Sequence, residues 1–297
     1  MDYKKIFKTP EVRGKILGLT CFVPDVMMLK LQYWIKTGRR LNIKNPKRFT
    51  EKLQWYKLHY KNPRMRQCVD KYAVRDYVKA KGLDKTLVKL YAKYRCVEDV
   101  EWQSLPDQFV LKTTNGGGGL NVVVCQDKSK LDTDNIKKKL VCKEYKPRTG
   151  GREWAYYNIK PQIIIEELLI DSNNPEAGIN DYKFFCYSGK AKYIVVDVDR
   201  YTEHKRNIYD TNWNRMNVTS DCPGAEIEIE KPENFEEMIR VAEQLSDEFP
   251  YVRVDLYNIN GHIYFGELTF YPWSGYVQYS PDEWDFIFGE DFSLKKY

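Results

Sequence analysis

Four consecutive glycines, Gly116 to Gly119, lie between two short apolar segments, and Lys112 precedes them. The apolar segments are residues 109–111 and 122–125. Two β-prone segments around a glycine tract indicate a hairpin with a long turn. Because glycine lacks a Cβ, its backbone N–H groups can approach an anion closely, and Lys112 can add a positive charge. The pattern favours a loop that covers phosphates, although a surface loop beside a solvated lysine has the same sequence.

Two carboxylates in the last apolar hairpin are spaced so that a cation could lie between them. They are Asp255, in residues 252–257, and Glu267, in residues 263–270. A two-residue turn at Asn260-Gly261 would place Asp255 opposite Gly266 and turn Glu267 to the other face of the sheet. A three-residue turn, or an equivalent bulge, places the two carboxylates face to face. They would then repel unless a cation such as Mg²⁺ separates them, so we expect either a magnesium site or two solvent-facing carboxylates.

Charged residues also interrupt two other apolar strands. Glu166 and Glu167 fall within residues 163–169, and Asp181 and Lys183 alternate with aromatic residues in 181–187. Since successive side chains of a strand point to opposite faces, Asp181 and Lys183 share a face, as do Arg253 and Asp255. Together with the glycine loop, these residues predict a site built from lysines, glycines and carboxylates.

The composition excludes several classes of protein. Hydrophobic residues make up 42% and aromatic residues 14%, as expected for an ordered globular protein. The excess of 48 Lys and Arg over 42 Asp and Glu suits an anionic ligand but does not call for nucleic acid. The most apolar stretch, residues 16–31, is too short and too interrupted by Pro24-Asp25 to span a bilayer. Seven scattered cysteines without a C-x-x-C pair indicate reduced thiols in a cytoplasmic protein, and three histidines argue against His-based metal or triad chemistry.

Apolar periodicity predicts the elements that position these residues. Residues 1–62 are expected to form amphipathic helices broken at Asn45-Pro46 and Asn62-Pro63. Further helices are predicted from Asp70, as N-cap, to Lys81, over 132–143 and over 232–248. Strands are predicted over 87–90, 109–111, 122–125, 163–169, 181–187, 192–196, 252–257 and 263–270. The polar residues 200–224 are expected to lie outside the core.

A set of motifs in a fixed order carries a family resemblance. It comprises Lys112 with its glycine loop, Ile163-Ile164-Ile165-Glu166-Glu167-Leu168-Leu169, Asp181-x-Lys183, Arg253-x-Asp255, and Glu267-x-Thr269 followed by Pro272 and Gly275. This set resembles the ATP-grasp superfamily. Residues 70–77 (DKYAVRDY), 181–185 (DYKFF) and 267–270 (ELTF) are similar to its TupA-like branch. The resemblance covers about residues 45 to 280.

The resemblance implies an α+β ATP-grasp fold in which two α+β lobes clamp ATP. We expect a helical extension over residues 1–62 and the N-terminal part of the core over 63–103. A mobile lid with the glycine loop should occupy 104–168, and the C-terminal catalytic core 169–297. A loop of four glycines is expected to become rigid only when phosphates order it.

The resemblance also assigns roles by position. Lys112 would contact the inner phosphates, and Gly116, Gly117, Gly118 and Gly119 would close over the outer ones. Glu166 would accept a hydrogen bond from the adenine amino group, and the backbone of Glu167 and Leu168 would hold the adenine edge. Asp181 would bind the ribose and Lys183 a phosphate. Asp255, Glu267 and Thr269 would hold Mg²⁺, with Thr269 replacing the asparagine usual in the superfamily, and Arg253 and Arg206 would act in catalysis.

The implied activity is that of an ADP-forming carboxylate–amine ligase that uses ATP and Mg²⁺ through an acyl phosphate. In the TupA-like branch its substrates would be an amine or amino acid and an acidic sugar or polymer, in the synthesis of surface or capsular polysaccharide near membrane-associated machinery. Two alternatives stay open. Asp197-Val198-Asp199 matches the D-x-D pattern of a glycosyltransferase that uses a nucleotide sugar. A kinase acting on a sugar hydroxyl would use the same ATP site.

Overall fold

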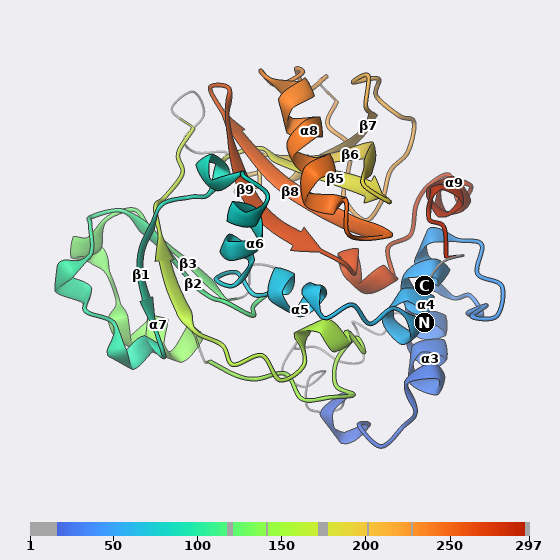
Figure 1. Ribbon diagram of the computed structural model, residues 1–297, viewed down its shortest axis with the longest axis horizontal. Helices are drawn as coiled ribbons and strands as arrows, with labels where there is room; N and C mark the ends of the chain where they lie inside the picture. Colours follow the sequence, from blue (N-terminus) through green and yellow to red (C-terminus); the bar gives the residue numbers. More distant parts are fainter. Residues whose placement is uncertain are drawn as a thin grey trace.

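The structure is a computed structural model that describes residues 17–117, 121–140, 142–171, 178–200, 202–226 and 228–294. Two antiparallel sheets dominate it (Figure 1). The larger has the strand order β7-β6-β5-β8-β9. Its strands are β5 (Asp181–Tyr187), β6 (Lys190–Val198), β7 (Lys205–Asp210), β8 (Tyr251–Ile259) and β9 (His262–Thr269).

One face of this five-stranded sheet packs against a helix as part of the main core. Helix α8 (Phe235–Ser246) lies across β5, β6 and β8, and its apolar positions recur with helical spacing (Figure 1). Met238, Ala242 and Leu245 of α8 are fully buried, as are Phe184 and Val254 beneath them. Alternation along each strand therefore sends the neighbouring charged residues to the opposite face.

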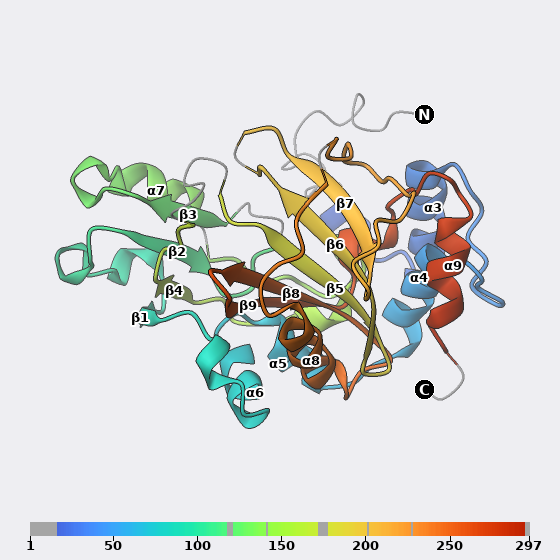
Figure 2. The ribbon, with the colours of Figure 1, turned by 90° about the horizontal axis from the view of Figure 1, so that it is seen from above.

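The smaller sheet, which we call the lid sheet, has the order β1-β4-β2-β3. Its strands are β1 (Leu90–Tyr94), β2 (Phe109–Thr113), β3 (Val122–Cys125) and β4 (Ile163–Glu166). Ile136 of helix α7 (Thr133–Lys139) and Leu140 pack with Phe109 and Leu111 in a separate small core. The lid sheet lies at one end of the molecule (Figures 1 and 2) and includes β1, upstream of the lid boundary expected at residue 104.

Five further α-helices lie in the described chain. They are α3 (Asp25–Thr37), α4 (Phe49–His59), α5 (Arg64–Val69), α6 (Val74–Ala80) and α9 (Trp284–Asp291). Short 3-10 turns occupy Asp84–Thr86, Val97–Asp99, Trp102–Ser104, Lys128–Lys130, Trp154–Tyr156 and Pro272–Gly275. In the part of the chain that is described, no helix has the length and apolar character needed to cross a membrane.

Helix α4 is part of the main core rather than an appendage to it. The Phe49 ring stacks on Phe185 of β5 at 5.6 Å between centroids and meets Phe288 of α9 edge-on at 6.4 Å. The Tyr56 hydroxyl donates to the Tyr251 carbonyl of β8 (3.1 Å). The N-terminal helices therefore pack on the same sheet that carries the charged face.

Several predicted elements are displaced in the structure. The strand expected over 87–90 begins at Leu90, and the helix expected over 132–143 ends at Lys139. The Asp70 side chain accepts the N–H groups of Tyr72 and Ala73, so it caps a turn that precedes α6 rather than α6 itself. The expectation that residues 200–224 lie outside the core is wrong, because they contain the edge strand β7.

Candidate active site

The charged face of the five-stranded sheet collects most of the predicted site residues. In the antiparallel register Asp181 pairs with Asp197, and Asp197 with Arg206. Lys183 lies opposite Asp255. Since cross-strand partners point to the same side, these residues share one face. The full set on this face is Asp181, Lys183, Asp197, Arg206, Arg253, Asp255, Glu267 and Thr269.

A bulge in β9 brings Glu267 opposite Asp255. The hairpin turns through the two residues Asn260 and Gly261, both with positive φ, and pairs Ile259 with His262. The register then shifts by one residue between Asp255 and Leu256, so that Asp255 pairs with Glu267. The extra residue is Gly266, where a Cβ would lie 3.0 Å from the Asp255 carbonyl oxygen. The predicted facing of the two carboxylates is confirmed, and it arises from the bulge together with the tight turn.

The cation between the two carboxylates in this structure is Arg253. Its guanidinium binds Asp255 through Nε (2.6 Å to Oδ1) and Nη2 (2.5 Å to Oδ2). The same Nη2 lies 3.2 Å from Glu267 Oε1 and 3.1 Å from Thr269 Oγ1. Three oxygen atoms thus converge on one positively charged nitrogen, which donates to them.

The same three oxygens are suitable ligands for a hard divalent cation. Mg²⁺ takes one or two carboxylates and completes its shell with waters and substrate phosphates. Asp255, Glu267 and Thr269 would hold it, and Arg253 marks the region that favours positive charge. Among the described residues no group of three or more His, Cys, Asp or Glu side chains is placed to hold a metal by itself. Substrate phosphates would have to supply the remaining ligands.

The two carboxylates differ in their electrostatics. Burial raises the pKa of Asp255 to about 7 against the pull of Arg253, with Asp181 adding to the rise. Burial acts in the same direction on Glu267, but Lys71, 3.7 Å away, and Arg253 outweigh it and lower the pKa of Glu267 to about 2. Glu267 is therefore the carboxylate that stays charged across the neutral range.

Lys183 lies between two buried aspartates. Its ammonium pairs with Asp181 and, at 2.9 Å, with Asp197. Asp181 Oδ2 also accepts from Arg200 (2.7 Å), whereas its buried Oδ1 has no hydrogen-bond partner among the described residues. A buried acceptor without a partner is costly, and a ligand hydroxyl would satisfy it. The predicted ribose contact of Asp181 suits this oxygen.

Asp197, the first residue of the D-x-D pattern, is fully engaged by cations. Arg206 donates to both of its oxygens, at 2.6 and 3.2 Å, and Lys183 pairs with it. Although burial alone would raise the pKa of Asp197, Lys183 and Arg206 hold it well below its usual range. Asp197 thus balances charge in the site, and these contacts count against a role in binding a nucleotide-sugar metal.

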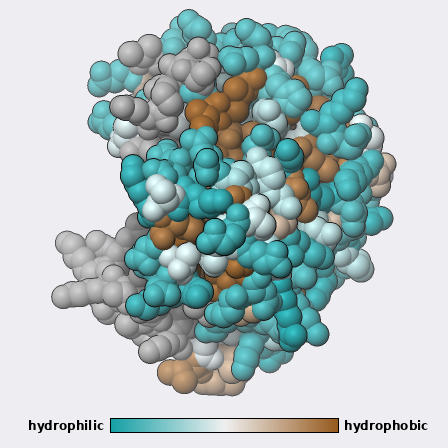
Figure 3. Space-filling view, turned by 90° about the vertical axis from the view of Figure 1, so that its left-hand side faces the viewer, coloured by the Kyte–Doolittle hydropathy of each residue, from teal (hydrophilic) through white to brown (hydrophobic). Residues whose placement is uncertain are grey.

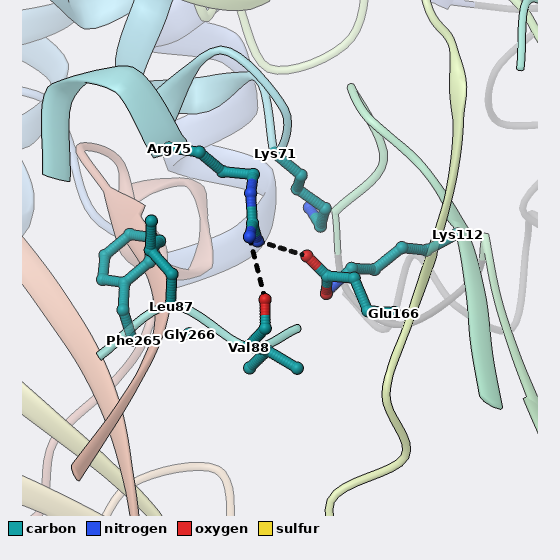
Figure 4. Close-up of a pocket in the computed structure, with 8 residues that line it drawn as sticks. All are labelled: Lys71, Arg75, Leu87, Val88, Lys112, Glu166, Phe265 and Gly266. Atoms are coloured by element: carbon teal, nitrogen blue, oxygen red, sulfur yellow. Dashed lines mark hydrogen bonds and ion pairs between the residues drawn. The ribbon is translucent and has the colours of Figure 1, made fainter. Parts of the chain in front are cut away.

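The lid sheet presents a second cluster of charges toward the core. Lys112 and Glu166 lie on the face of the lid sheet opposite Leu111 and Ile165, and their side chains meet at 2.6 Å. Arg75 donates to the other oxygen of Glu166 (3.0 Å) and to the Val88 carbonyl (2.9 Å). These residues line a pocket with Lys71, Leu87, Phe265 and Gly266 (Figure 4). A pocket with three cations at the junction of lid and core suits an anionic ligand.

The lid residues constrain the predicted adenine contacts. Both Glu166 oxygens already accept from cations, so an adenine amino group would compete with these ion pairs. The Glu167 amide donates to the Lys89 carbonyl (2.9 Å), so its N–H is engaged in this structure, and the predicted adenine contact of its backbone stays a prediction. Leu168 follows directly on this bonded residue, and its predicted role stays a prediction.

The glycine loop is described up to Gly117. At Gly116 a Cβ would lie 2.7 Å from Thr113 Oγ1 and 2.9 Å from Asn121 Cβ, so the close approach there requires glycine. Lys71 donates to the Gly116 carbonyl and thereby links the loop to the Glu267 side of the site. Gly118 and Gly119 lie outside the described residues.

Three residues of this site were not assigned a role from the sequence. Lys71 and Arg75 are four residues apart, a spacing that puts two side chains on one helical face, and this spacing could have revealed them. The third is Trp273, whose ring lies 4.7 Å from the Arg206 guanidinium and 5.3 Å from that of Arg253. Trp273 and Ser274 both have positive φ, a strained conformation that the surrounding contacts must hold.

Comparison with known proteins identifies the family. The chain belongs to the TupA-like ATP-grasp family, whose model, described as TupA-like ATPgrasp, matches residues 51–293. The α+β arrangement of two lobes is accordingly the ATP-grasp fold. No curated protein matches the chain.

Several solved structures are similar to this chain at low identity. A D-alanine–D-alanine ligase from Bacillus anthracis is 18% identical over 68% of this chain and 56% of its own, with a TM-score of 0.42. An L-amino acid ligase from Bacillus licheniformis is 15% identical over 86% of this chain and 55% of its own, with a TM-score of 0.44. The ADP complex of purK, an N5-carboxyaminoimidazole ribonucleotide synthetase, is 20% identical over 74% of this chain and 50% of its own, with a TM-score of 0.41. The chain spans about half the length of these proteins.

Proposed function

We propose that this protein is an ATP- and Mg²⁺-dependent ligase that joins a carboxylate to an amine. The observation that carries the proposal is the convergence of Asp255, Glu267 and Thr269 on Arg253 Nη2. The pocket lined by Lys71, Arg75 and Lys112 lies next to it, with Lys71 in contact with Glu267. An oxygen-rich metal site beside a cationic pocket is the arrangement that phosphoryl transfer requires.

The reaction proceeds in two steps. A carboxylate oxygen of the first substrate attacks the γ-phosphorus of ATP, and ADP leaves. The amine nitrogen of the second substrate then attacks the acyl carbon, phosphate leaves, and the nitrogen loses a proton. Asp255, Glu267 and Thr269 would hold Mg²⁺, which would neutralise charge on the phosphates.

The residues of the chain act through position and charge. Lys112, Arg75, Lys71 and Lys183 bind the phosphates, and Arg206 neutralises the buried Asp197 beside Lys183. Arg253 exchanges part of its contact with Asp255 for the developing negative charge on the acyl group. No nucleophilic side chain is needed, because preorganised charges and the alignment of substrates lower the barrier.

We further propose that the amine is an amino acid or related amine and that the carboxylate belongs to an acidic sugar or polymer used in surface polysaccharide. Membership of the TupA-like family supports this assignment. The guanidinium groups of Arg206 and Arg253 beside the Trp273 ring suit an acidic acceptor.

The test is a screen of ADP and phosphate release with MgATP over amino acids crossed with uronic acids. We expect release of both products only when an amine and an acid are present together. ADP without phosphate, formed with a sugar alone, would support a kinase instead. A nucleoside diphosphate released from a nucleotide sugar would support the glycosyltransferase. Glu267→Gln serves as the inactive control.

A further inference from the structure

Helix α3 exposes an apolar face to solvent. Its buried side carries Met28, Leu29 and Tyr33, and its outward arc carries Val26, Met27, Leu31, Trp34 and Ile35. Trp34 is 54% exposed, and the preceding Phe22 is 78% exposed. Large apolar side chains gathered in this way are unusual on a protein that has no partner there. By contrast, apolar residues on the lid end of the molecule form small, separate patches (Figure 3).

Positive charge surrounds this apolar face. Lys30 lies within the outward arc of α3, and the exposed Arg40, Lys44 and Lys47 follow the helix. Residues 17–48 contain seven Lys and Arg against one Asp, whereas the whole chain has 48 against 42. The one acidic residue, Asp25, pairs with Arg152 at 3.6 Å on the buried side. The outward arc of α3 therefore carries no negative charge.

We propose that α3 and the segment before it, residues 19–35, dock on an anionic lipid membrane. The apolar side chains enter the boundary between headgroups and acyl chains, where tryptophan is favoured, and Lys30 and Arg40 meet lipid phosphates. A symmetric contact between two copies of the chain would set these cations against their own counterparts, so charge favours the lipid surface. This inference goes beyond the ligase activity and does not depend on it.

The position of α3 is compatible with this docking. Figures 1 and 2 both place α3 at the end of the molecule opposite the lid sheet. A protein held by α3 therefore keeps its lid and the candidate active site away from the lipid surface.

The experiment is co-sedimentation of the full chain with vesicles. One set contains phosphatidylcholine alone, and the other contains equal parts phosphatidylcholine and phosphatidylglycerol. We expect binding to the second set that is weakened roughly a hundredfold by Leu31→Ser with Trp34→Ser. Lys30→Glu with Arg40→Glu should weaken it roughly tenfold or more. The matched control is Val124→Ser, which removes an exposed apolar side chain from the lid end and should leave binding unchanged.

Three results would overturn the proposal. The first is the absence of binding to anionic vesicles, and the second is equal binding by the double variants and the parent. The third is a concentration-dependent dimer, formed without vesicles, that Leu31→Ser with Trp34→Ser abolishes. Because α3 lies outside the candidate active site, ATP-dependent turnover of these variants should match the parent. Failure of the docking proposal is thus distinguishable from failure of the ligase proposal.

Discussion

A guanidinium placed among two carboxylates and a hydroxyl holds them in one geometry before any ligand binds. Arg253 bonds to Asp255, Glu267 and Thr269 at 2.5 to 3.2 Å through one nitrogen. Charge-assisted bonds of this kind are short and directional, so they fix the rotamers of the predicted metal ligands. Binding of Mg²⁺ then requires a shift of one arginine rather than the ordering of three side chains.

Replacing Glu267 by glutamine should abolish most turnover while leaving the protein folded. The amide keeps the shape of the side chain but removes the carboxylate that stays charged at neutral pH. Loss of one metal ligand should lower the rate of ADP formation on the order of a thousandfold or more. Initial rates and a thermal melt measure the two effects. A folded variant with near-parent turnover would show that the hairpin is only structural.

Replacing Arg75 by glutamine should weaken nucleotide binding more than it lowers the maximal rate. Arg75 lines the pocket between lid and core, whereas Asp255 and Glu267 do not line it. Removal of one charge-assisted contact is expected to raise the ATP KM about tenfold or more, since such bonds contribute about 1.5–3 kcal/mol. Steady-state kinetics over ATP concentration measures both constants. An unchanged KM with a reduced kcat would place Arg75 at the chemical step instead.

Among the elements, β9 shows most clearly what the sequence could and could not predict. The face-to-face arrangement of Asp255 and Glu267 followed from their chemistry, but the bulge at Gly266 depends on a contact with the Asp255 carbonyl that no local pattern reveals. Strand β7 was missed for a related reason. Its buried residue Arg206 is polar because it lies within the site, and the buried Asn207 on the other face bonds to the Ala225 amide, so an apolar pattern cannot detect such a strand.

Gly266→Ala should therefore disturb the site through the backbone. A Cβ at this position would lie 3.0 Å from the Asp255 carbonyl oxygen and 3.2 Å from the Tyr257 ring, so β9 must shift by some tenths of an ångström. We expect turnover to fall about tenfold or more, since active sites are sensitive to small displacements. The neighbouring turn offers a control. Asn260→Gly keeps the turn conformation and should leave the rate unchanged.

At the scale of the whole molecule, the N-terminal helices belong to the main hydrophobic core. Deleting residues 1–62 removes Phe49, Leu53 and Tyr56, which are fully buried. Truncating one buried Leu or Phe side chain costs about 2–5 kcal/mol, so loss of all three is comparable to the whole stability of a typical domain. We expect the truncated chain to show no cooperative melt by circular dichroism, while Phe49→Ala lowers the melting temperature measurably. A cooperative melt of the truncated chain would mean that the helices are a separable extension.

The N-terminal helices could be recognised from their apolar spacing, but their place in the fold could not. Their buried residues meet strands more than a hundred positions away, and spacing within a helix carries no information about such partners. Lys57 illustrates this. A lysine in an amphipathic helix suggests a solvated face, yet its ammonium is buried and donates to the carbonyls of Gly151 and Ser274, each at 2.9 Å.

Lys57 should give the stability a distinct dependence on pH. Burial lowers the pKa of Lys57 from 10.5 to about 8. Between these values the unfolded chain holds a proton that the folded protein has lost, so stability rises with pH. Relative to Lys57→Met, the free energy of unfolding of the parent should increase by about 3 kcal/mol from pH 8 to 10.5. Urea titrations across this range measure it, and a constant difference would contradict it.

Trp273 gives the site an optical reporter of its own. Its indole lies against the guanidinium groups of both Arg206 and Arg253, so the electric field at the ring depends on where these two charges lie. If Mg²⁺ and phosphates draw Arg253 away from Asp255, the fluorescence emission of Trp273 changes even though the ligand does not contact the indole. The difference in fluorescence between the parent and Trp273→Phe would then record occupancy of the metal site in real time, without a label and before any product forms.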